Sequence, residues 1–320
     1  MKILVTGWAG FIGSNLIRKL LQSCSEEDEI MGLDAYTYAA RPEWVLEMEN
    51  PKPKFHKMRI DLNWHRELEY VVKEFQPDKV YHLAAESHVC RSIEGPRAFA
   101  ETNFMGTFNL LEALRKSNFK GKIVHVSTDE TFGQLKEFDP PFHEKTLIEP
   151  TSPYAASKAA SDLMVNAYVH TYGFNACITR CTNNYGPNQH EEKLIPKAIM
   201  SFLSGKPMTL YGPGNQVREW IHVDDHNDAL ISVMRDGRTG EIYCIGSGLE
   251  LSNKEVIEFV AKVINTKHEI IHTNDRPTDD FRYAVNTDKI KTTGWEPCAS
   301  TSYFLNKLAA TVEWYKEHGK

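Results

Sequence analysis

Short apolar runs alternate with amphipathic helical patterns through the first half of the chain. The apolar runs predict strands, and continuous runs such as KILV and KIVHV are typical of strands covered on both faces. Between the runs, apolar residues recur at helical spacing and predict helices at residues 13–23, 66–75 and 108–117. The predicted strands lie at residues 2–7, 29–35, 55–62, 79–85, 122–128 and 176–182.

This alternation predicts right-handed parallel βαβ units, and therefore an α/β protein with a Rossmann-type, doubly wound parallel sheet. After about residue 185 the chain becomes rich in glycine, proline and charge, which indicates loops around a pocket. Residues 242–248 predict one more strand of the sheet, and residues 253–264 and the last segment predict helices. We therefore expect a smaller α/β C-terminal domain beside the sheet.

Composition and charge argue against several classes of protein. The chain has 320 residues, a net charge of -6 and a pI near 6.1, whereas nucleic-acid binders usually carry a basic surface. It contains no run of about 18 apolar residues, as a membrane span would require, and no signal-peptide pattern, so we expect a cytoplasmic protein. Six scattered cysteines indicate reduced thiols. Cys177 and Cys181 lack the further ligands of a usual metal site, so no metal is expected.

Glycines at positions 7, 10 and 13 stand between the first predicted strand and the first predicted helix. Glycine permits a tight turn, and a helix N-terminus offers unpaired N–H groups to a pyrophosphate, so this GxxGxxG spacing predicts a dinucleotide site. Asp34 ends the second strand about 20 residues later, where a carboxylate accepts hydrogen bonds from ribose hydroxyls and repels a 2′-phosphate. NAD is therefore expected rather than NADP; a turn aspartate is the alternative.

The cofactor site should extend to the ends of the next strands, because ligands of open α/β sheets gather at the carboxyl ends of the strands. The expected cofactor-binding residues are Gly7, Gly10, Phe11, Ile12, Gly13, Asp34, Asp61, Leu62, Leu83, Ala84, Ala85, Tyr154 and Lys158. Trp8 is a bulky residue inside the glycine turn, and the sequence gives no reason for it.

Tyr154 and Lys158 lie four residues apart in TSPYAASKAASDLM, a segment that predicts the start of a helix. Thr151 or Ser152 can cap this helix, and Pro153 suits its first turn. The lysine cation and the positive helix N-terminus both favour tyrosinate, so they should lower the tyrosine pKa toward a catalytic range. Downstream of the glycine motif, the pair predicts a catalytic tyrosine.

The stretch HVSTDETFG, residues 125–133, ends a predicted core strand with two hydroxyls and two carboxylates. Asp129 and Glu130 are adjacent, and like charges a few ångströms apart oppose double ionisation. One carboxyl group can then be a neutral acid while the other is a base. A solvated loop with a capping aspartate is the alternative, but the position before the Tyr–Lys pair favours an active site.

Together these motifs resemble those of the extended short-chain dehydrogenase/reductases, and more narrowly those of the nucleotide-sugar 4,6-dehydratases. The likeness runs in order from residue 7 to about residue 284 and therefore covers most of the chain. The matching stretches are GWAGFIGSN, HLAAESHVCRSI, ETNFMGTFNLLEA, HVSTDETFG, YAASKAASD, RCTNNYGPNQHEEKLIP, LYGPGNQVREWIHVDDH and DRPTDDFRYA.

The resemblance implies a lyase that acts on a nucleotide-hexose with NAD. Tyr154 would act as the base during oxidation at sugar C4, with Lys158 beside it and Thr128 holding the C4 oxygen. Glu130 would remove the C5 proton, and Asp129 would protonate the C6 hydroxyl so that it leaves as water. Hydride return to C6 would give a 4-keto-6-deoxy sugar. The resemblance favours dTDP-glucose as substrate over UDP-glucose or UDP-N-acetylglucosamine.

The resemblance also implies a pocket for the nucleotide sugar. Arg218 and Arg276 would bind the diphosphate, since a guanidinium engages phosphate oxygens through two donors; a surface charge is the alternative for each. Tyr211 and Tyr283 would lie near the base, with core packing as the alternative. The expected substrate-binding residues are Ser87, His88, Thr128, Asn183, Glu192, Lys193, Leu194, Tyr211, Arg218, Arg276 and Tyr283.

Three positions depart from the family's usual pattern. Cys90 stands where aspartate is usual, Thr278-Asp279 replaces Gly-His, and Phe132 replaces a tyrosine. The first two lie near expected substrate-binding segments, so the nucleotide and the sugar stay open.

Two further expectations concern organisation. Helices at about 99–116 and 154–171 carry apolar stripes, and we expect them to pair in a four-helix bundle between two copies, as is common in the superfamily. The expected domains are an NAD-binding domain of residues 1–182 plus about 220–250, and a nucleotide-sugar-binding domain of about 183–219 plus 251–320.

A 4-epimerase or a decarboxylase on the same scaffold is the main alternative. Those enzymes use the Tyr–Lys pair but need no acid/base pair for C5 and C6, so Asp129 and Glu130 argue against them. A non-catalytic NAD-binding regulator is a third interpretation, and the intact Thr128, Tyr154 and Lys158 argue against it.

Overall fold

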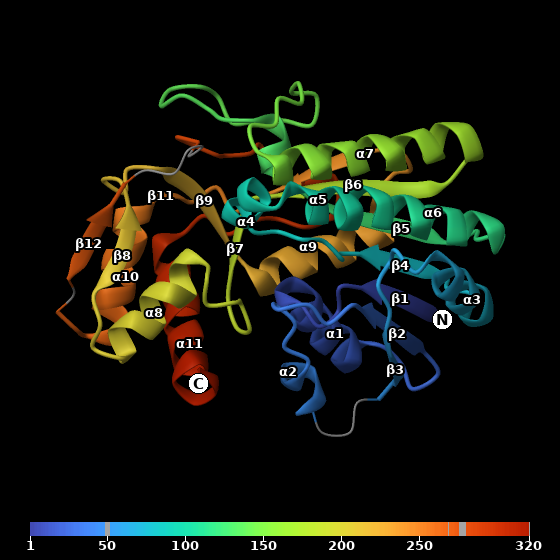
Figure 1. Ribbon diagram of the computed structural model, residues 1–320, viewed down its shortest axis with the longest axis horizontal. Helices are drawn as coiled ribbons and strands as arrows, with labels where there is room; N and C mark the ends of the chain where they lie inside the picture. The colour runs from blue at the N-terminus through green and yellow to red at the C-terminus, as the bar shows by residue number, and fades with distance from the viewer. Residues whose placement is uncertain (49–51, 268, 275–279, 320) are drawn as a thin grey trace.

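The centre of the molecule is a parallel sheet with helices on both faces (Figure 1). The computed structural model describes residues 1–48, 52–267, 269–274 and 280–319. Within these residues the sheet has seven strands in the order β3-β2-β1-β4-β5-β6-β10, and each neighbouring pair is parallel. They are β1 (Lys2–Thr6), β2 (Glu29–Asp34), β3 (Lys54–Arg59), β4 (Lys79–His82), β5 (Lys122–Thr128), β6 (Asn175–Cys181) and β10 (Ile242–Ile245). The predicted strands and the Rossmann-type sheet are confirmed.

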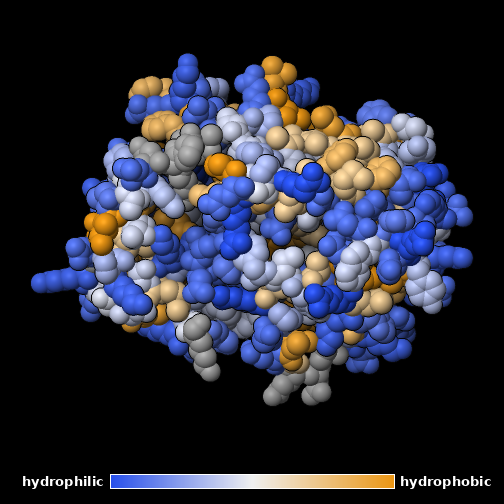
Figure 2. Space-filling view, viewed as in Figure 1, coloured by the Kyte–Doolittle hydropathy of each residue, from blue (hydrophilic) through white to orange (hydrophobic). Residues whose placement is uncertain are grey.

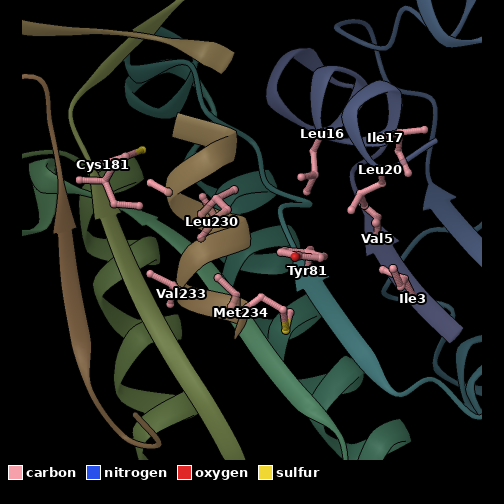
Figure 3. Close-up of a cluster of buried hydrophobic side chains, with 14 of the residues drawn as sticks. Ile3, Val5, Leu16, Ile17, Leu20, Tyr81, Cys181, Leu230, Val233 and Met234 are labelled. Carbon is pink, nitrogen blue, oxygen red and sulfur yellow. The ribbon is translucent and has the colours of Figure 1, made fainter. Parts of the chain in front are cut away.

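Two helical layers enclose this sheet. α1 (Phe11–Ser23) and α9 (Val223–Asp236) pack together on one face, while α3 (His65–Phe75), α6 (Gly106–Lys116) and α7 (Pro153–Tyr172) cover the other. Figure 3 shows how α1 and α9 contribute apolar side chains over β1 and β4, including Leu16, Ile17, Leu20, Leu230, Val233 and Met234. Each such fully buried side chain contributes roughly 1.5–3 kcal/mol by leaving water. The core therefore holds the strand ends in fixed positions.

A second group of elements lies beside the sheet, on the left in Figure 1, around its own apolar cluster. In the described residues β11, β9 and β7 form one small sheet, and β12 and β8 pair in another. Its elements are β7 (Asn183–Tyr185), α8 (Leu194–Leu203), β8 (Met208–Tyr211), β9 (Val217–His222), β11 (Glu250–Ser252), α10 (Asn253–Ile264), β12 (Ile270–Thr273) and α11 (Thr301–His318). This arrangement accounts for the glycine- and proline-rich loops after residue 185.

The remaining elements are short and lie at connections. They are α2 (Glu43–Leu46), α4 (Val89–Glu94), α5 (Pro96–Phe99), η1 (Ala100–Met105), η2 (Asp129–Phe132) and η3 (Ile290–Thr293). The helix expected from about residue 99 begins earlier, in α5, and passes through η1, a stretch of π-helix, before α6. Periodicity does not reveal such a stretch, because it changes the spacing by one residue per turn only locally.

The structure explains Trp8. Its side chain is completely buried, and a Cβ added to Gly32 of β2 would lie 2.6 Å from the indole ring. Phe55 and Tyr36 meet the indole edge-to-face, with ring centroids 5.1 Å and 5.9 Å away. Trp8 therefore fills the space that Gly32 leaves open between the glycine turn and the sheet.

Candidate active site

A cavity of about 310 Å³ opens at the carboxyl ends of the central strands, where ligands of doubly wound sheets bind. The structure brings all the expected cofactor-binding residues together around it: Gly7, Gly10, Phe11, Ile12, Gly13, Asp34, Asp61, Leu62, Leu83, Ala84, Ala85, Tyr154 and Lys158. The sequence analysis missed other lining residues, among them Thr37, Ala40, Thr102 and Thr182. Thr102 and Thr182 stand within quoted stretches, so a signal was available for these two.

The glycine turn is shaped for close approach of a phosphate group. Gly7 has a φ of 72°, and a Cβ on Gly13 would lie 2.1 Å from the carbonyl oxygen of Gly7. The turn runs straight into α1, whose first-turn N–H groups lack partners within the helix. These residues therefore suit the pyrophosphate of a dinucleotide.

Asp34 combines the two roles considered from the sequence. Its carboxylate accepts hydrogen bonds from the backbone N–H groups of Ala9 at 2.9 Å and Tyr36 at 2.7 Å, so it does stabilise the turn. It also lines the cavity, and a carboxylate can accept more than two hydrogen bonds. Burial raises the pKa of Asp34, while these two backbone hydrogen bonds oppose the rise.

Tyr154 and Lys158 lie on the inner face of α7. Ser152 caps this helix by accepting a hydrogen bond from the Ala155 N–H at 3.1 Å, and Pro153 follows in the first turn as expected. Both Tyr154 and Lys158 are buried, and the Lys158 Nζ donates to the Val126 carbonyl at 2.8 Å. The helix thus presents the pair to the floor of the cavity.

The expected lowering of the Tyr154 pKa is wrong for the protein as described. Burial and then the charge of Glu130 raise the pKa of Tyr154 well above its usual value, and only a hydrogen bond with Thr128 opposes the rise. Burial also lowers the pKa of Lys158, which weakens the cation that was expected to favour tyrosinate. Sequence spacing shows that two groups are neighbours, but not how deeply both are buried.

Thr128, Asp129 and Glu130 form the turn after β5. The Thr128 hydroxyl accepts a hydrogen bond from the Glu130 N–H at 3.3 Å and donates to the Asp129 carboxylate at 3.2 Å. Asp129 is 2% exposed, and its pKa is raised well above the usual value by burial, then by the charges of Glu130 and Glu219. The raised pKa favours the neutral form of Asp129, which is the form that an acid for a leaving hydroxyl requires.

A second cavity, of about 260 Å³, adjoins the first. Its lining includes every other described residue expected to contact substrate, namely Ser87, His88, Asn183, Glu192, Lys193, Leu194, Tyr211, Arg218 and Tyr283, while Thr128 lines the first cavity. Arg276 lies outside the described residues. Glu130, Asn183 and Lys193 line both cavities, so the acid–base turn stands where the two meet.

Several lining residues of this second cavity were missed from the sequence. Thr151 donates to the Asp280 carboxylate at 2.6 Å, and the Tyr283 hydroxyl donates to the same oxygen. The Arg218 guanidinium lies over the Tyr283 ring, 4.6 Å from its centroid. Asp280 stands within the quoted stretch DRPTDDFRYA, which was the available signal, but only folding brings it beside Thr151.

The positions that depart from the family's usual pattern have different surroundings in the structure. Cys90 lines the second cavity. Phe132 is buried between the Arg180 guanidinium, 4.5 Å from its ring centroid, and the ring of Phe142, 5.0 Å away, so its ring faces rather than a hydroxyl make the contacts. Asp279 lies outside the described residues.

Within the part of the chain that the structure describes, no helix is long and apolar enough to cross a membrane. No group of three or more histidine, cysteine or acidic side chains there is placed to bind a metal ion. Cys177 and Cys181 are both buried in β6 as free thiols.

Comparison with known proteins agrees with this geometry. The family model of GDP-mannose 4,6 dehydratase matches residues 4–308. The chain belongs to this family. It is 41% identical to the dTDP-glucose 4,6-dehydratase of Salmonella typhimurium, with 98% of this chain and 92% of that protein aligned. It is 40% identical to dTDP-glucose 4,6-dehydratase 1 of Escherichia coli, over 100% and 94% of the two chains.

Solved structures of this family are similar throughout. DesIV, the dTDP-glucose 4,6-dehydratase of Streptomyces venezuelae solved with NAD, has a TM-score of 0.92 at 42% identity, covering 99% of this chain and 98% of its own. The UDP-glucose 4-epimerase of Thermus thermophilus in complex with NAD has a TM-score of 0.90 at 30% identity, covering 99% and 100%. Dehydratase and epimerase thus share the fold, so only the residues of the site can distinguish the two activities.

Proposed function

We propose that this protein is an NAD-dependent nucleotide-hexose 4,6-dehydratase, a hydro-lyase that converts dTDP-glucose to the 4-keto-6-deoxy sugar. The observation that carries the proposal is the turn at Asp129 and Glu130. It places a buried neutral acid and a second carboxyl group beside Tyr154, where the two cavities meet. Removal of water across C5 and C6 needs one base and one acid in addition to the group that acts at C4.

The first half of the reaction is oxidation at C4. Tyr154 takes the proton of the C4 hydroxyl, Thr128 holds the C4 oxygen through its hydroxyl, and Lys158 is the neighbouring cation that stabilises ionised Tyr154. Gly7, Gly13 and the other lining residues of the first cavity hold NAD. When bound, NAD would supply the hydride acceptor for C4 and, in its reduced form, the hydride donor for C6.

The second half is elimination. A ketone at C4 acidifies the C5 proton, and Glu130 removes it. Asp129 gives its proton to the C6 hydroxyl, which leaves as water. The raised pKa of Asp129 favours the form that carries this proton, since burial and the neighbouring Glu130 and Glu219 all oppose its loss.

The second cavity would hold the nucleotide diphosphate and part of the sugar. Lys193 and Arg218 supply positive charge on its wall, and the Lys193 Nζ donates to the Ser87 carbonyl at 2.9 Å. We place Arg218 and Arg276 at the diphosphate, and Tyr211 near the base. The names of the relatives support dTDP-glucose as substrate ahead of UDP-glucose or UDP-N-acetylglucosamine.

A 4-epimerase remains the second candidate, because the epimerase from Thermus thermophilus matches the fold almost as well as DesIV does. An epimerase uses Tyr154 and Lys158 but has no task for a buried neutral acid beside a second carboxyl group. The Asp129–Glu130 turn therefore favours the dehydratase.

We further propose a cytoplasmic homodimer. Figure 2 shows a pale orange, apolar area over the surface formed by α6 and α7. Leu163 of α7 is 58% exposed and Met105 of η1 is 41% exposed. These helices suit a four-helix bundle between two copies. The proposed units are an NAD-binding domain, residues 1–182 and about 220–250, and a nucleotide-sugar-binding domain, about 183–219 and 251–320. Most buried residues of three apolar clusters fall within one unit or the other, which supports this division.

The experiment is incubation of the purified protein and NAD with a panel of nucleotide sugars, with the product masses followed over time. We expect dTDP-glucose to yield a product that is lighter by one water molecule. Inversion at C4 with no loss of water would overturn the proposal in favour of the epimerase. Light scattering on the same sample tests the dimer, and a monomer at micromolar concentration would contradict it.

A further inference from the structure

A buried charge network lies behind the two catalytic groups and has no part in the reaction as described above. Asp162, Arg180 and His125 come from α7, β6 and β5, and each is at most 1% exposed. The Arg180 Nε donates to the Asp162 Oδ2 at 3.0 Å, and the His125 Nε2 lies 3.3 Å from the Asp162 Oδ1. Burial of charged groups costs free energy even when they are paired, so we asked what function this network has.

The network reaches Lys158 along the helix. Asp162 follows Lys158 by four residues, so both side chains lie on one face of α7. The titratable groups that face Lys158 from the packed elements are His82 on β4, His125 on β5, Cys181 on β6 and Asp162 itself. Burial lowers the pKa of both histidines, and it raises the pKa of the Cys181 thiol to about 12. Asp162 is therefore the anion of this set.

The network also reaches the acid–base turn. The Arg180 guanidinium, fixed by Asp162, lies 4.5 Å from the centroid of the Phe132 ring. Phe132 is the last residue of η2, which begins at Asp129. Phe142 stacks on the other side of Phe132, with ring centroids 5.0 Å apart. The turn that carries both carboxyl groups is thus packed on Arg180.

We propose that Asp162 is a positioning residue for both halves of the site. It is the counter-ion that keeps Lys158 cationic. Through Arg180 and the Phe132 ring it also fixes the turn that presents Asp129 and Glu130. Burial opposes the charge on Asp162, but the hydrogen bond with His125 and the charges of Arg180 and Lys158 together hold its pKa below the usual value, as this role requires.

The test for Lys158 uses the full chain without substrate, so it reads the charge directly. Lysine labelled with ¹³C at Cε is titrated by NMR, and the Lys158 signal is identified by its loss in Lys158→Arg. In Asp162→Asn we expect the pKa of Lys158 to fall by about one unit, since an opposite charge nearby shifts a pKa by one to three units. Asp228→Asn is the control, since it changes an exposed carboxylate of α9 to an amide outside this network, and it should leave the Lys158 titration unchanged. An unchanged Lys158 titration in Asp162→Asn overturns the counter-ion role.

Asp162→Asn leaves Arg180 without its buried partner, so the single variant could fail to fold. The double variant Asp162→Asn/Arg180→Gln removes both charges and keeps the same test. It should show the same fall in the Lys158 pKa. A Lys158 titration equal to that of the wild type in the folded double variant contradicts the proposal.

A separate variant tests the link from Arg180 through Phe132 to the acid–base turn, and this test rests on the proposed function. Phe132→Leu keeps an apolar side chain but removes the ring under Arg180. We expect kcat to fall roughly tenfold, with the KM for dTDP-glucose within twofold and the Lys158 titration unmoved, because only the turn is loosened. An unchanged kcat overturns the link from Arg180 to the turn. Failure of the wild type to dehydrate dTDP-glucose would instead count against the proposed function, while the NMR titration would still decide the counter-ion role.

Discussion

The two cavities of this protein are built in different ways. The cofactor cavity is formed where consecutive strands end, so its lining comes from short motifs such as the glycine turn, Asp34 and the segment 83–85. The substrate cavity is lined by loops and short strands that are far apart in the chain, such as Ser87, Lys193 and Asp280. A site made of consecutive motifs is a property of local sequence, whereas a site made of distant loops is a property of the completed fold.

Within the cofactor cavity, two buried groups differ in the charge that they favour. At the cofactor cavity the buried cation Lys158 lies on the same helix as Asp162. Asp129 lines the same cavity, and burial and the charges of Glu130 and Glu219 raise its pKa although the charge of Arg218 opposes the rise. The anion of Asp162 favours the charged form of Lys158, whereas burial favours the neutral form of Asp129. The two groups are therefore suited to different proton transfers.

The largest effect is expected for Tyr154→Phe, which removes the proposed C4 base from the lining of the cofactor cavity. The side chain keeps its packing but has no hydroxyl to take the C4 proton. We expect kcat to fall by roughly 10³-fold with KM changed little, as for loss of a general base. Steady-state kinetics with dTDP-glucose measures it, and a kcat within tenfold of wild type would contradict the role of Tyr154.

The substrate cavity is tested by Arg218→Gln. Loss of a charge-assisted hydrogen bond to phosphate costs about 1.5–3 kcal/mol, so KM for dTDP-glucose should rise roughly tenfold to 100-fold. The chemistry at C4 to C6 does not involve this group, and kcat should stay within about threefold. Arg235→Gln is the control, since that side chain is 65% exposed and lies on α9. A drop in kcat at constant KM would place Arg218 at the reacting atoms instead.

Asp34→Asn tests whether Asp34 of the cofactor cavity selects NAD over NADP. The amide loses the anion that accepts from ribose hydroxyls and repels a 2′-phosphate, and its single oxygen can keep only one of the two backbone hydrogen bonds from Ala9 and Tyr36. We expect the Kd for NAD to rise about tenfold, as for one lost charge-assisted hydrogen bond, and binding of NADP to become measurable by calorimetry. Asp228→Asn, at an exposed surface carboxylate, is the control. An unchanged preference between NAD and NADP would restrict Asp34 to the structural role.

The smallest effect concerns stability and follows from the raised pKa of Asp129. Below the usual value of 3.8 the carboxyl group is protonated in both the folded and the unfolded chain. As the pH rises, the unfolded chain loses this proton first, so the folded state loses about 1.4 kcal/mol per pH unit until the folded pKa is reached. Asp129→Asn lacks this loss, so its free energy of unfolding relative to wild type should increase as the pH rises from about 4 to about 7.

Asp224→Asn is the control of opposite sign for that measurement. Hydrogen bonds and charges from His222 and Lys307 lower the pKa of Asp224, so its stabilising contribution is present above 3.8 and is lost as the pH falls through the folded pKa. Denaturant unfolding at several pH values measures both variants. A pH-independent difference between Asp129→Asn and wild type would show that the Asp129 pKa is not raised.

The same contrast between the cavities separates what could be predicted from what could not. The strands, the glycine turn and the lining of the cofactor cavity followed from apolar runs and local motifs, because local spacing determines which residues follow each strand. The π-helical stretch η1, the pairing of Thr151 with Asp280, and the packing of Trp8 over Gly32 depend on tertiary contacts. The spacing of residues along the chain therefore does not predict these features.

Electrostatics was the hardest property to predict. The adjacency of Asp129 and Glu130 predicted that one carboxyl group would hold its proton more strongly, and the pKa of Asp129 is raised, by burial first and by Glu130 second. The same reasoning gave the wrong direction for Tyr154, because the depth of burial exceeds the effect of Lys158 and is not visible in the sequence. Neighbouring charges can be counted from the chain, whereas desolvation is a property of the folded core.

The most direct test of the central claim is the reaction of Glu130→Gln with dTDP-glucose and NAD, with the nucleotide sugar recovered from the quenched enzyme and its mass measured. The variant keeps Tyr154, Lys158 and Asp129 but lacks the base for C5. We expect oxidation at C4 without loss of water, so the recovered sugar should be lighter by two hydrogen atoms, and the wild-type product should be lighter by one water molecule. Formation of the dehydrated product by Glu130→Gln at the wild-type rate would contradict the account.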